Sequence, residues 1–201
     1  MIQLIIFDFD DTLVNNHNLD YKSFEIPCKK LSLIPPTKKD IKLSRKKGFL
    51  AIHMIKNYLK ELNRKEFFKR FIKERNNFLE QDQTHYLTTQ KNTHKLLQFL
   101  KKKNIKMIII TANKNKKAVL NFLHNEKLFR YFYKILFMDD LHIQLNNSTS
   151  SNRVLIKSSL LNKSLKNSKT PKTEILYVGN SLEDFESSKY FKINFINFQN
   201  E

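Results

Sequence analysis

Several residue types are scarce in this 201-residue chain, which has one cysteine, two glycines, four prolines and no tryptophan. A single cysteine, Cys28, cannot form a disulfide within the chain, and it lacks the paired spacing of a zinc site. We therefore expect Cys28 to serve as a small apolar residue that is at least partly buried. The sequence gives no support for a disulfide or zinc framework.

Long hydrophobic runs are also missing. No stretch of about 18 apolar residues is present, as a membrane-spanning helix would need. The apolar run at the N-terminus turns acidic at Asp8, too soon for the core of a signal peptide. We expect a soluble, cytoplasmic protein with no membrane partner. Because domains usually have about 100–200 residues, one domain with an insertion is the expected organisation.

Acidic residues are few, with 19 Asp and Glu against 37 Lys and Arg, and the formal net charge is +18. This charge would attract a phosphorylated substrate, nucleic acid or an anionic membrane. The abundance of Lys, Asn, Ile and Phe is, however, also the composition that an AT-rich coding bias gives. No basic and aromatic recognition module stands out in the sequence, so nucleic acid is a possible partner that the sequence does not favour.

Short apolar runs recur along the chain and indicate buried strands. They cover residues 2–7, 105–110, 135–138, 175–178 and 193–198. Between them, apolar residues are spaced as on one face of a helix. Strands that alternate with helices favour a parallel sheet. We therefore predict an α/β fold with a Rossmann-like parallel sheet flanked by helices.

The stretch from residue 15 to residue 88 interrupts this alternation, because it contains helical spacing and no clear strand. One apolar stripe comprises Phe49, Ile52, Ile55, Tyr58 and Leu59, and a second comprises Phe67, Phe68, Phe71, Ile72, Phe78 and Leu79. Such short helices need a partner face in water. We predict a small helical domain over 15–88, inserted into a core formed by 1–14 and 89–201. Asn15–Asn18 and Thr84–Thr89 are its expected linkers.

The most informative segment is Asp8-Phe9-Asp10-Asp11-Thr12, which directly follows the first predicted strand. Its three carboxylates repel one another, so a cation or a proton must compensate for them. Acidic turns that only cap a strand or a helix are common, but they need neither a buried strand nor a threonine at this spacing. The segment resembles the first motif of the haloacid dehalogenase superfamily, D-x-D-x-T. The inserted helical domain stands where members with a helical cap carry theirs.

A second segment, Thr111-Ala112-Asn113, follows an apolar strand and is similar to the second motif of this superfamily. A hydroxyl at a strand end, together with free amides at the start of a helix, suits a phosphate oxygen. The resemblance implies that these residues bind phosphate. Asn113 is also well placed to be only a helix N-cap.

Residues 175–184 resemble the fourth motif, an apolar strand that ends in Gly-Asp with a second Asp four residues after the first. Here Gly179 precedes Asn180 where the family has its first Asp, and Asp184 stands at the second position. An amide oxygen can ligate Mg²⁺ but brings no charge, so we expect weaker metal binding. Ser181 and Asp184 also have the spacing of a capping box, in which Asp184 would be a structural cap.

The third motif of the family is a lysine near the start of the helix that precedes the fourth-motif strand. This helix is expected at about residues 153–167, where both Lys157 and Arg153 could supply the cation. Lys157 has the better apolar spacing after it, so we select Lys157. Any one lysine in so basic a chain is more often solvated than catalytic.

The resemblance implies a Mg²⁺-dependent phosphohydrolase that acts on a small phosphorylated metabolite. Asp8 would attack phosphorus and form an aspartyl-phosphate, and Asp10 would protonate the leaving group and then activate water. Thr12 would orient Asp10, while Thr111 and Lys157 would offset charge. Mg²⁺ would bind Asp8, Asp10 through its carbonyl, Asn180 and Asp184. The cap would exclude water and select the leaving group.

Other functions fit the same residues. Asn180 favours a degenerate, metal-poor binding protein on this fold, and the +18 charge favours a phosphatase that acts on nucleic-acid ends. A sugar phosphomutase would use the same two aspartates, whereas a dehalogenase would have no use for Asp10. The histidines show no metal-ligand spacing, and only His17 and His53 are kept as candidate substrate contacts.

Overall fold

The chain forms two compact units, one comprising Met1–Asn15 and Thr88–Glu201 and the other Asn16–Leu87. The computed structural model describes residues 1–46, 54–56, 59, 67–81, 83–141, 150–166 and 168–198. The first unit contains a five-stranded sheet and the second contains helices.

The sheet has the strand order β5-β4-β1-β6-β7, and every neighbouring pair is parallel. Its strands are β1 (Leu4–Asp8), β4 (Lys106–Thr111), β5 (Lys134–Phe137), β6 (Ile175–Gly179) and β7 (Asn194–Asn197). Each lies within or beside one of the five apolar runs of the sequence. The predicted Rossmann-like parallel sheet is therefore confirmed.

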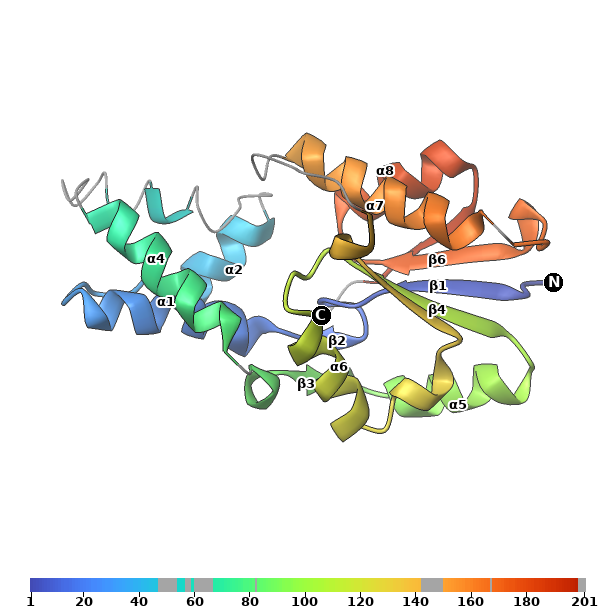
Figure 1. The fold of residues 1–201 in the computed structure, drawn as a ribbon, viewed down its shortest axis with the longest axis horizontal. Coiled ribbons are helices and arrows are strands. Elements are labelled where there is room, and N and C mark those ends of the chain that lie inside the picture. Colours follow the sequence, from blue (N-terminus) through green and yellow to red (C-terminus); the bar gives the residue numbers. More distant parts are fainter. Residues whose placement is uncertain are drawn as a thin grey trace. The chain divides into compact units, whose positions relative to one another are not determined.

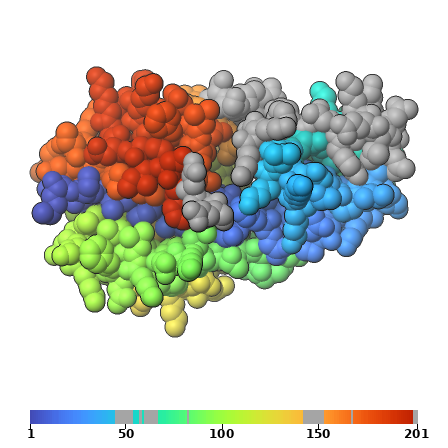
Figure 2. Space-filling view, turned by 180° about the vertical axis from the view of Figure 1, so that it is seen from behind, coloured from blue at the N-terminus to red at the C-terminus, as the bar shows by residue number. Residues whose placement is uncertain are grey.

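Helices cover both faces of this sheet (Figure 1). On one face lie α7 (Ser150–Leu165) and α8 (Leu182–Phe191), and on the other lie α5 (Thr93–Lys102) and α6 (Lys116–Asn125). Burial on both faces explains why β1 is apolar up to its last residue, Asp8, and why every residue of the strand is buried. Figure 2 shows the same layers from behind, with the blue N-terminal segment between the red and green segments.

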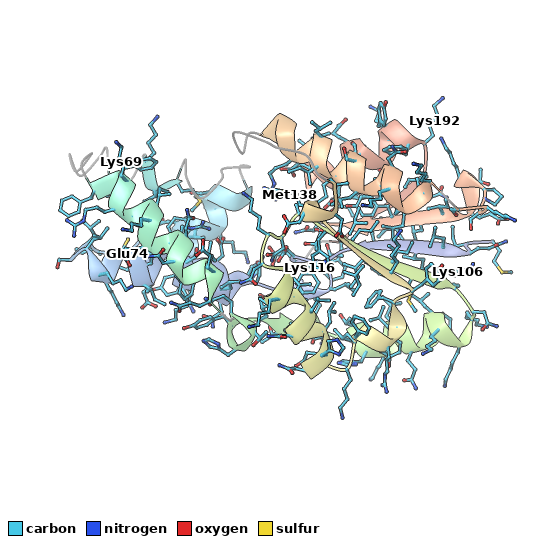
Figure 3. All side chains as sticks on the ribbon, in the orientation of Figure 1. Lys69, Glu74, Lys106, Lys116, Met138 and Lys192 are labelled. Carbon is cyan, nitrogen blue, oxygen red and sulfur yellow. The ribbon has the colours of Figure 1, made fainter. Side chains whose placement is uncertain are left out.

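A buried cluster joins the sheet to α7, and its largest side chain is the fully buried Tyr177. The cluster also contains Leu4, Ile6, Ile108, Ile110, Leu136, Ile156, Leu160, Leu161, Ile175 and Ile193. Each buried aliphatic side chain of this kind contributes about 1.5–3 kcal/mol through removal from water. This packing fixes the strands whose ends carry the polar residues described below, and charged side chains project outward from it (Figure 3).

Two short strands, β2 (Val14–Asn15) and β3 (Thr88–Thr89), form an antiparallel pair in the first unit. They lie where the chain leaves this unit and where it returns. The sequence did not predict them, because two residues are too few to show an alternating pattern. The expected linkers are partly ordered, since α1 begins at His17 and a 3₁₀ helix spans Thr84–Tyr86.

The second unit contains α1 (His17–Lys30), α2 (Lys38–Lys46) and α4 (Phe67–Glu80). Their apolar faces form a separate cluster: Phe24, Cys28, Leu31, Leu33, Ile41, Met54, Ile55, Leu59 and Phe71. Cys28 is buried, as predicted, and burial raises the pKa of its thiol to about 11.

The second apolar stripe of the sequence forms the buried side of α4, where Phe71 and Phe78 are buried. Of the first stripe, Ile55 and Leu59 are buried, while Phe49, Ile52 and Tyr58 lie outside the described residues. No helix among the described residues has the length and apolar character that crossing a membrane requires.

Candidate functional site

Three strand ends meet at the carboxyl edge of the sheet. β1 ends at Asp8, β4 at Thr111 and β6 at Gly179, and β1 lies between the other two. Asp8 is level with Ile110, the residue before Thr111. Because strands in a parallel sheet end at the same edge, residues that are about 100 and 170 positions apart in sequence become neighbours.

The chain turns sharply after Asp8. The carbonyl of Phe9 accepts hydrogen bonds from the amides of Leu13 and Val14, and Asp11 has a φ of 55°. The Phe9 ring is fully buried and packs edge-on against Phe122 of α6. This buried ring anchors the turn between the two aspartates, Asp8 and Asp10.

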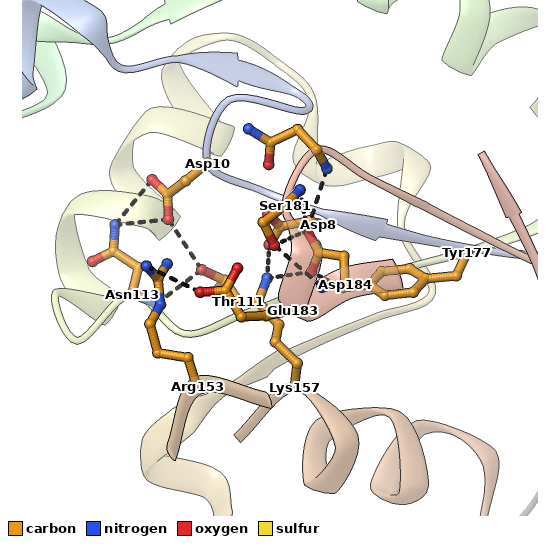
Figure 4. Close-up of polar contacts among 11 residues, drawn as sticks. Asp8, Asp10, Thr111, Asn113, Arg153, Lys157, Tyr177, Ser181, Glu183 and Asp184 are labelled. Carbon is orange, nitrogen blue, oxygen red and sulfur yellow. Dashed lines mark hydrogen bonds and ion pairs between the residues drawn. The ribbon is translucent and has the colours of Figure 1, made fainter. Parts of the chain in front are cut away.

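Lys157 links two buried aspartates. Its ammonium group donates a hydrogen bond to Asp8 Oδ1 and lies 3.1 Å from Asp184 Oδ1 (Figure 4). All three side chains are buried. Arg153, the other candidate cation, instead lies 3.5 Å from Glu183. Of the two cations that the sequence offered, the structure brings Lys157 to Asp8.

Burial raises the pKa of Asp8 to about 7, and the negative charges of Asp184 and Asp10 add to this effect while Lys157 opposes it. Burial also acts to raise the pKa of Asp184, but Lys157 and the hydrogen bonds of Tyr177 and Ser181 outweigh it and lower this pKa. Burial disfavours the charged form of Lys157, yet Asp184 and Asp8 together raise its pKa. Lys157 therefore stabilises the charged form of Asp184 more than that of Asp8.

Protein donors saturate the Asp184 carboxylate. Oδ1 accepts from the Tyr177 hydroxyl and faces Lys157, while Oδ2 accepts from the Ser181 hydroxyl at 2.7 Å and from the amides of Asn180 and Ser181. Ser181 and Asp184 form the capping box at the start of α8. Both carboxylate oxygens are thus engaged, which favours a positioning role for Asp184 over direct metal ligation.

The glycine of the fourth motif has a steric cause. A Cβ atom at position 179 would lie 2.6 Å from Cγ and Oδ2 of Asp184. Such a distance is far below van der Waals contact, so a side chain here would displace the carboxylate. Gly179 allows Asp184 to fold back over the strand end and reach Lys157.

Asp10 faces the end of β4. Its carboxylate lies 3.5 Å from the Thr111 hydroxyl and 3.4 Å from the Asn113 amide nitrogen (Figure 4). The Thr111 hydroxyl accepts a hydrogen bond from the Asn113 backbone amide at 3.0 Å. The helix N-cap is Asn115, whose side chain accepts from Ala118, so Asn113 is not the cap of α6. Asn113 instead joins the first and second motif segments.

One expected contact is not formed, and the two histidines kept as candidate substrate contacts stay predictions. The Thr12 hydroxyl is buried without a hydrogen-bond partner, so it does not orient Asp10 in this structure. His17 is exposed on α1 in the second unit, and His53 lies outside the described residues. Sequence reasoning also missed Tyr177, whose hydroxyl supports Asp184. An aromatic residue in an apolar strand gave no sign that its hydroxyl would be used.

The residues at this edge fit a hard divalent cation such as Mg²⁺. Asp8 and Asp10 supply carboxylate oxygens, and Asn180 adds a neutral amide at the adjacent strand end. Asp8, Asp10 and Asp184 outnumber Lys157, so the site has excess negative charge. Within the described part of the chain, no three His, Cys, Asp or Glu residues gather into a metal-binding group. A cation would therefore depend on backbone or amide oxygens as well.

Comparisons with known proteins agree with this architecture. Residues 5–198 match the family model described as haloacid dehalogenase-like hydrolase. No curated protein matches the chain.

Three similar solved structures each align with 98% of this chain. A haloacid dehalogenase-like family protein from Streptococcus pneumoniae is 16% identical, with 85% of its chain covered and a TM-score of 0.74. A hydrolase of subfamily IA from Geobacter sulfurreducens is 12% identical, with 86% covered and a TM-score of 0.72. A predicted phosphoglycolate phosphatase from Haemophilus somnus is 18% identical, with 84% covered and a TM-score of 0.73. At these identities the likeness concerns the fold.

Proposed function

Because the chain belongs to the haloacid dehalogenase-like hydrolase family, we propose that it is a Mg²⁺-dependent phosphohydrolase with Asp8 as its nucleophile. The substrate would be a small phosphorylated metabolite. The observation that carries this proposal is the buried Asp8 at a strand end, held by Lys157 and followed two residues later by Asp10. A carboxylate in so costly an environment needs a function, and nucleophilic attack supplies one.

The proposed reaction has two steps. A carboxylate oxygen of Asp8 forms a bond to phosphorus while the bond from phosphorus to the leaving oxygen breaks, and Asp10 donates its proton to that oxygen. Asp10 then removes a proton from water, which attacks phosphorus and releases phosphate and the free Asp8. Asp10 lies beside Thr111 and Asn113, which hold its carboxylate toward the strand ends.

The end of β4 is the proposed phosphate cradle. The Thr111 hydroxyl accepts from the Asn113 amide and donates to the Asp10 carboxylate at 3.5 Å, and its proton would turn to a phosphate oxygen when substrate binds. Ala112 would present its backbone amide, and Lys157 would add positive charge next to the reacting carboxylate. Lys157 is in place before substrate arrives, so among these side chains only the Thr111 hydroxyl has to reorient.

Asp8, the carbonyl of Asp10 and the side-chain oxygen of Asn180 are the proposed ligands of Mg²⁺. When bound, the ion would supply charge neutralisation between the nucleophile and the phosphate dianion. Asp184 would act through Lys157, because its own oxygens are engaged by protein donors. We also propose that the inserted helical domain over 15–88 serves as a cap that selects the leaving group.

The test is phosphate release from a panel of small phosphate esters, with and without millimolar Mg²⁺. The wild type should show metal-dependent turnover, and Asp8→Asn should abolish it. Asp139→Asn is the matched control, because Asp139 is an exposed aspartate after β5. The ester that is hydrolysed fastest would identify the substrate class, and product analysis would separate a phosphatase from a mutase.

Asn180 supports a second candidate, a binding protein that has lost turnover. It stands at the end of β6, where the fourth motif of the family has a metal-binding aspartate. This candidate predicts no turnover in the wild type and a gain of turnover in Asn180→Asp. A wild type that turns over at millimolar Mg²⁺ would exclude it.

A further inference from the structure

Positive charge is concentrated in one part of the chain. Between Gln83 and Met138 there are twelve lysine and arginine residues and one acidic residue, Glu126. The chain as a whole has 37 basic and 19 acidic residues. A compositional bias would act along the whole sequence, so it does not explain this local excess. The segment forms α5, β4, α6 and β5, all within the first unit.

The fold brings two portions of this segment together. Lys101 at the end of α5 donates a hydrogen bond to the carbonyl of Arg130 at 3.1 Å, and its ammonium group lies 5.7 Å from the Tyr131 ring. Arg130 also packs over Tyr131, with its guanidinium 5.1 Å from the ring centre. Residues about 30 positions apart thus form one surface.

Exposed aromatic rings lie among these cations. Phe99 is 55% exposed and has the Lys103 ammonium 5.8 Å from its ring centre, and Tyr133 is 78% exposed. We define the α5 surface as Phe99, Lys101, Lys103, Arg130, Tyr131 and Tyr133. It combines cations for phosphates with aromatic rings for bases, the two features that proteins use to bind single-stranded nucleic acid.

This surface lies away from the candidate catalytic residues. The Tyr133 amide bonds to the carbonyl of Met107 near the start of β4, whereas Thr111 ends that strand. Lys134 starts β5, on the same side as Lys106 at the start of β4. The charges of the α5 surface therefore lie at the amino edge of the sheet. They do not serve the proposed phosphate cradle, which lies at the carboxyl edge.

We propose that the α5 surface binds single-stranded nucleic acid. The cations would contact backbone phosphates, and Tyr133 and Phe99 would stack on bases. In Figure 2 the green segment, which includes α5, lies at the surface of the molecule. A lipid surface fits less well, because Leu97 and Leu100 of α5 are buried and its exposed apolar residues, Leu96 and Phe99, form no continuous apolar face among the lysines.

The first test measures how a fluorescent 12-nucleotide oligouridylate binds across a series of salt concentrations. Lys101→Gln, Lys103→Gln and Arg130→Gln are combined in one variant. Each lost phosphate contact should reduce the slope of log affinity against log salt by about 0.7, so the triple variant should lose about 2 units of slope. Its affinity at low salt should fall at least tenfold.

The matched control neutralises the same number of charges on the other side of the sheet. Lys172, Lys189 and Lys192 are all exposed, and Figure 3 shows Lys192 on the α8 side. The variant that changes these three residues to Gln has the same net charge as the first. It should keep the wild-type affinity and slope. If both triple variants weaken binding equally, only net charge matters and the proposal is overturned.

The second test separates stacking from charge. Tyr133→Ala should weaken oligouridylate binding about tenfold without changing the salt slope, because stacking on one ring is lost and the phosphate contacts remain. Tyr190→Ala is the control, since Tyr190 on α8 is 76% exposed and thus equally accessible.

Three further outcomes would overturn the proposal. These are no binding by the wild type at 50 mM salt, no effect of Tyr133→Ala, and equal affinity for a duplex of the same length. A surface that binds only through phosphate contacts would show no effect of Tyr133→Ala and equal affinity for the duplex. The measurement is independent of turnover, so it remains decisive if the chain proves to have no phosphohydrolase activity.

Discussion

The end of β1 and the first turn of α8 each place one aspartate against Lys157, yet the two aspartates have opposite surroundings. Asp184 accepts hydrogen bonds from a tyrosine, a serine and two backbone amides, and its pKa is lowered. Asp8 shares the same lysine, and its pKa is raised to about 7. Two buried carboxylates beside one cation thus differ in what solvates their charge.

This difference assigns them different physical roles. A carboxylate whose charge is fully solvated by fixed donors is a stable counterion and a weak nucleophile. A carboxylate with little solvation is costly to keep but has an oxygen that remains available for reaction. We therefore expect Asp184 to support stability and Lys157 position, and Asp8 to support chemistry at the expense of stability.

Removal of the shared cation should have the largest effect on this arrangement. Lys157→Met keeps the apolar length of the side chain but leaves Asp8 and Asp184 buried without their cation. We expect a loss of about 3–5 kcal/mol in the free energy of unfolding, measured by urea denaturation, and complete loss of the proposed phosphatase activity. Lys163→Met, an exposed position in the same helix, should stay within about 0.5 kcal/mol of the wild type. Equal stabilities for the two variants would refute the shared-cation role.

Gly179→Ala should act on the Asp184 side alone. The added methyl group would lie 2.6 Å from the Asp184 carboxylate and must push it away from Lys157. We expect a loss of about 2–3 kcal/mol, at the upper end of overpacking effects. Ser181→Ala removes one donor to the same carboxylate without a clash and should cost about 1 kcal/mol. If Gly179→Ala and Ser181→Ala lower the free energy of unfolding by the same amount, steric displacement of the Asp184 carboxylate is not the cause of the Gly179→Ala effect.

Asp8→Asn should separate stability from activity. Because the pKa of Asp8 is raised from 3.8 to about 7, the folded state holds a proton that the unfolded state releases, so wild-type stability falls as pH rises between these values. At pH 8 in the presence of chelator, the free energy of unfolding of the variant should exceed that of the wild type by about 1–2 kcal/mol. This gain is smaller than the stability difference that the pKa shift alone implies, because Lys157 loses its charged partner. At pH 3.5 this gain should vanish.

The fold could be predicted because its signals are local. Each strand of the sheet lies within or beside a short apolar run, and the interruption of that pattern indicated the inserted helices. The short pair β2 and β3 escaped prediction because its two-residue strands carry no periodicity. The α5 surface also escaped, because its cations and rings come from residues 99–103 and 130–133, which only the fold brings together.

The site was predictable to the extent that its motifs end strands. Asp8, Thr111 and Gly179 were found in this way, and the parallel sheet aligns their strand ends. The choice between Lys157 and Arg153 needed the structure, since both lie on the same helix and only one reaches Asp8. The environment of Asp184 was also hidden, because a capping box and a metal ligand use the same aspartate.

The smallest expected effect concerns Tyr177. Its hydroxyl donates to Asp184 Oδ1 and its ring is fully buried against Phe195. Tyr177→Phe keeps the ring and removes one donor from a charged acceptor, so the free energy of unfolding should fall by about 1–2 kcal/mol. Turnover should fall about threefold to tenfold with KM unchanged, because Lys157 is held less firmly while the proposed phosphate cradle is intact.

The split between kcat and KM distinguishes this role from mere packing. Tyr190→Phe, on the exposed side of α8, should change neither value. A Tyr177→Phe variant with lower stability but wild-type kcat would show that the hydroxyl stabilises the fold without positioning Lys157. In that case Asp184 would hold Lys157 in place without help from Tyr177. The solvation of Asp184 would then contribute to stability alone, and the contrast with Asp8 would be complete.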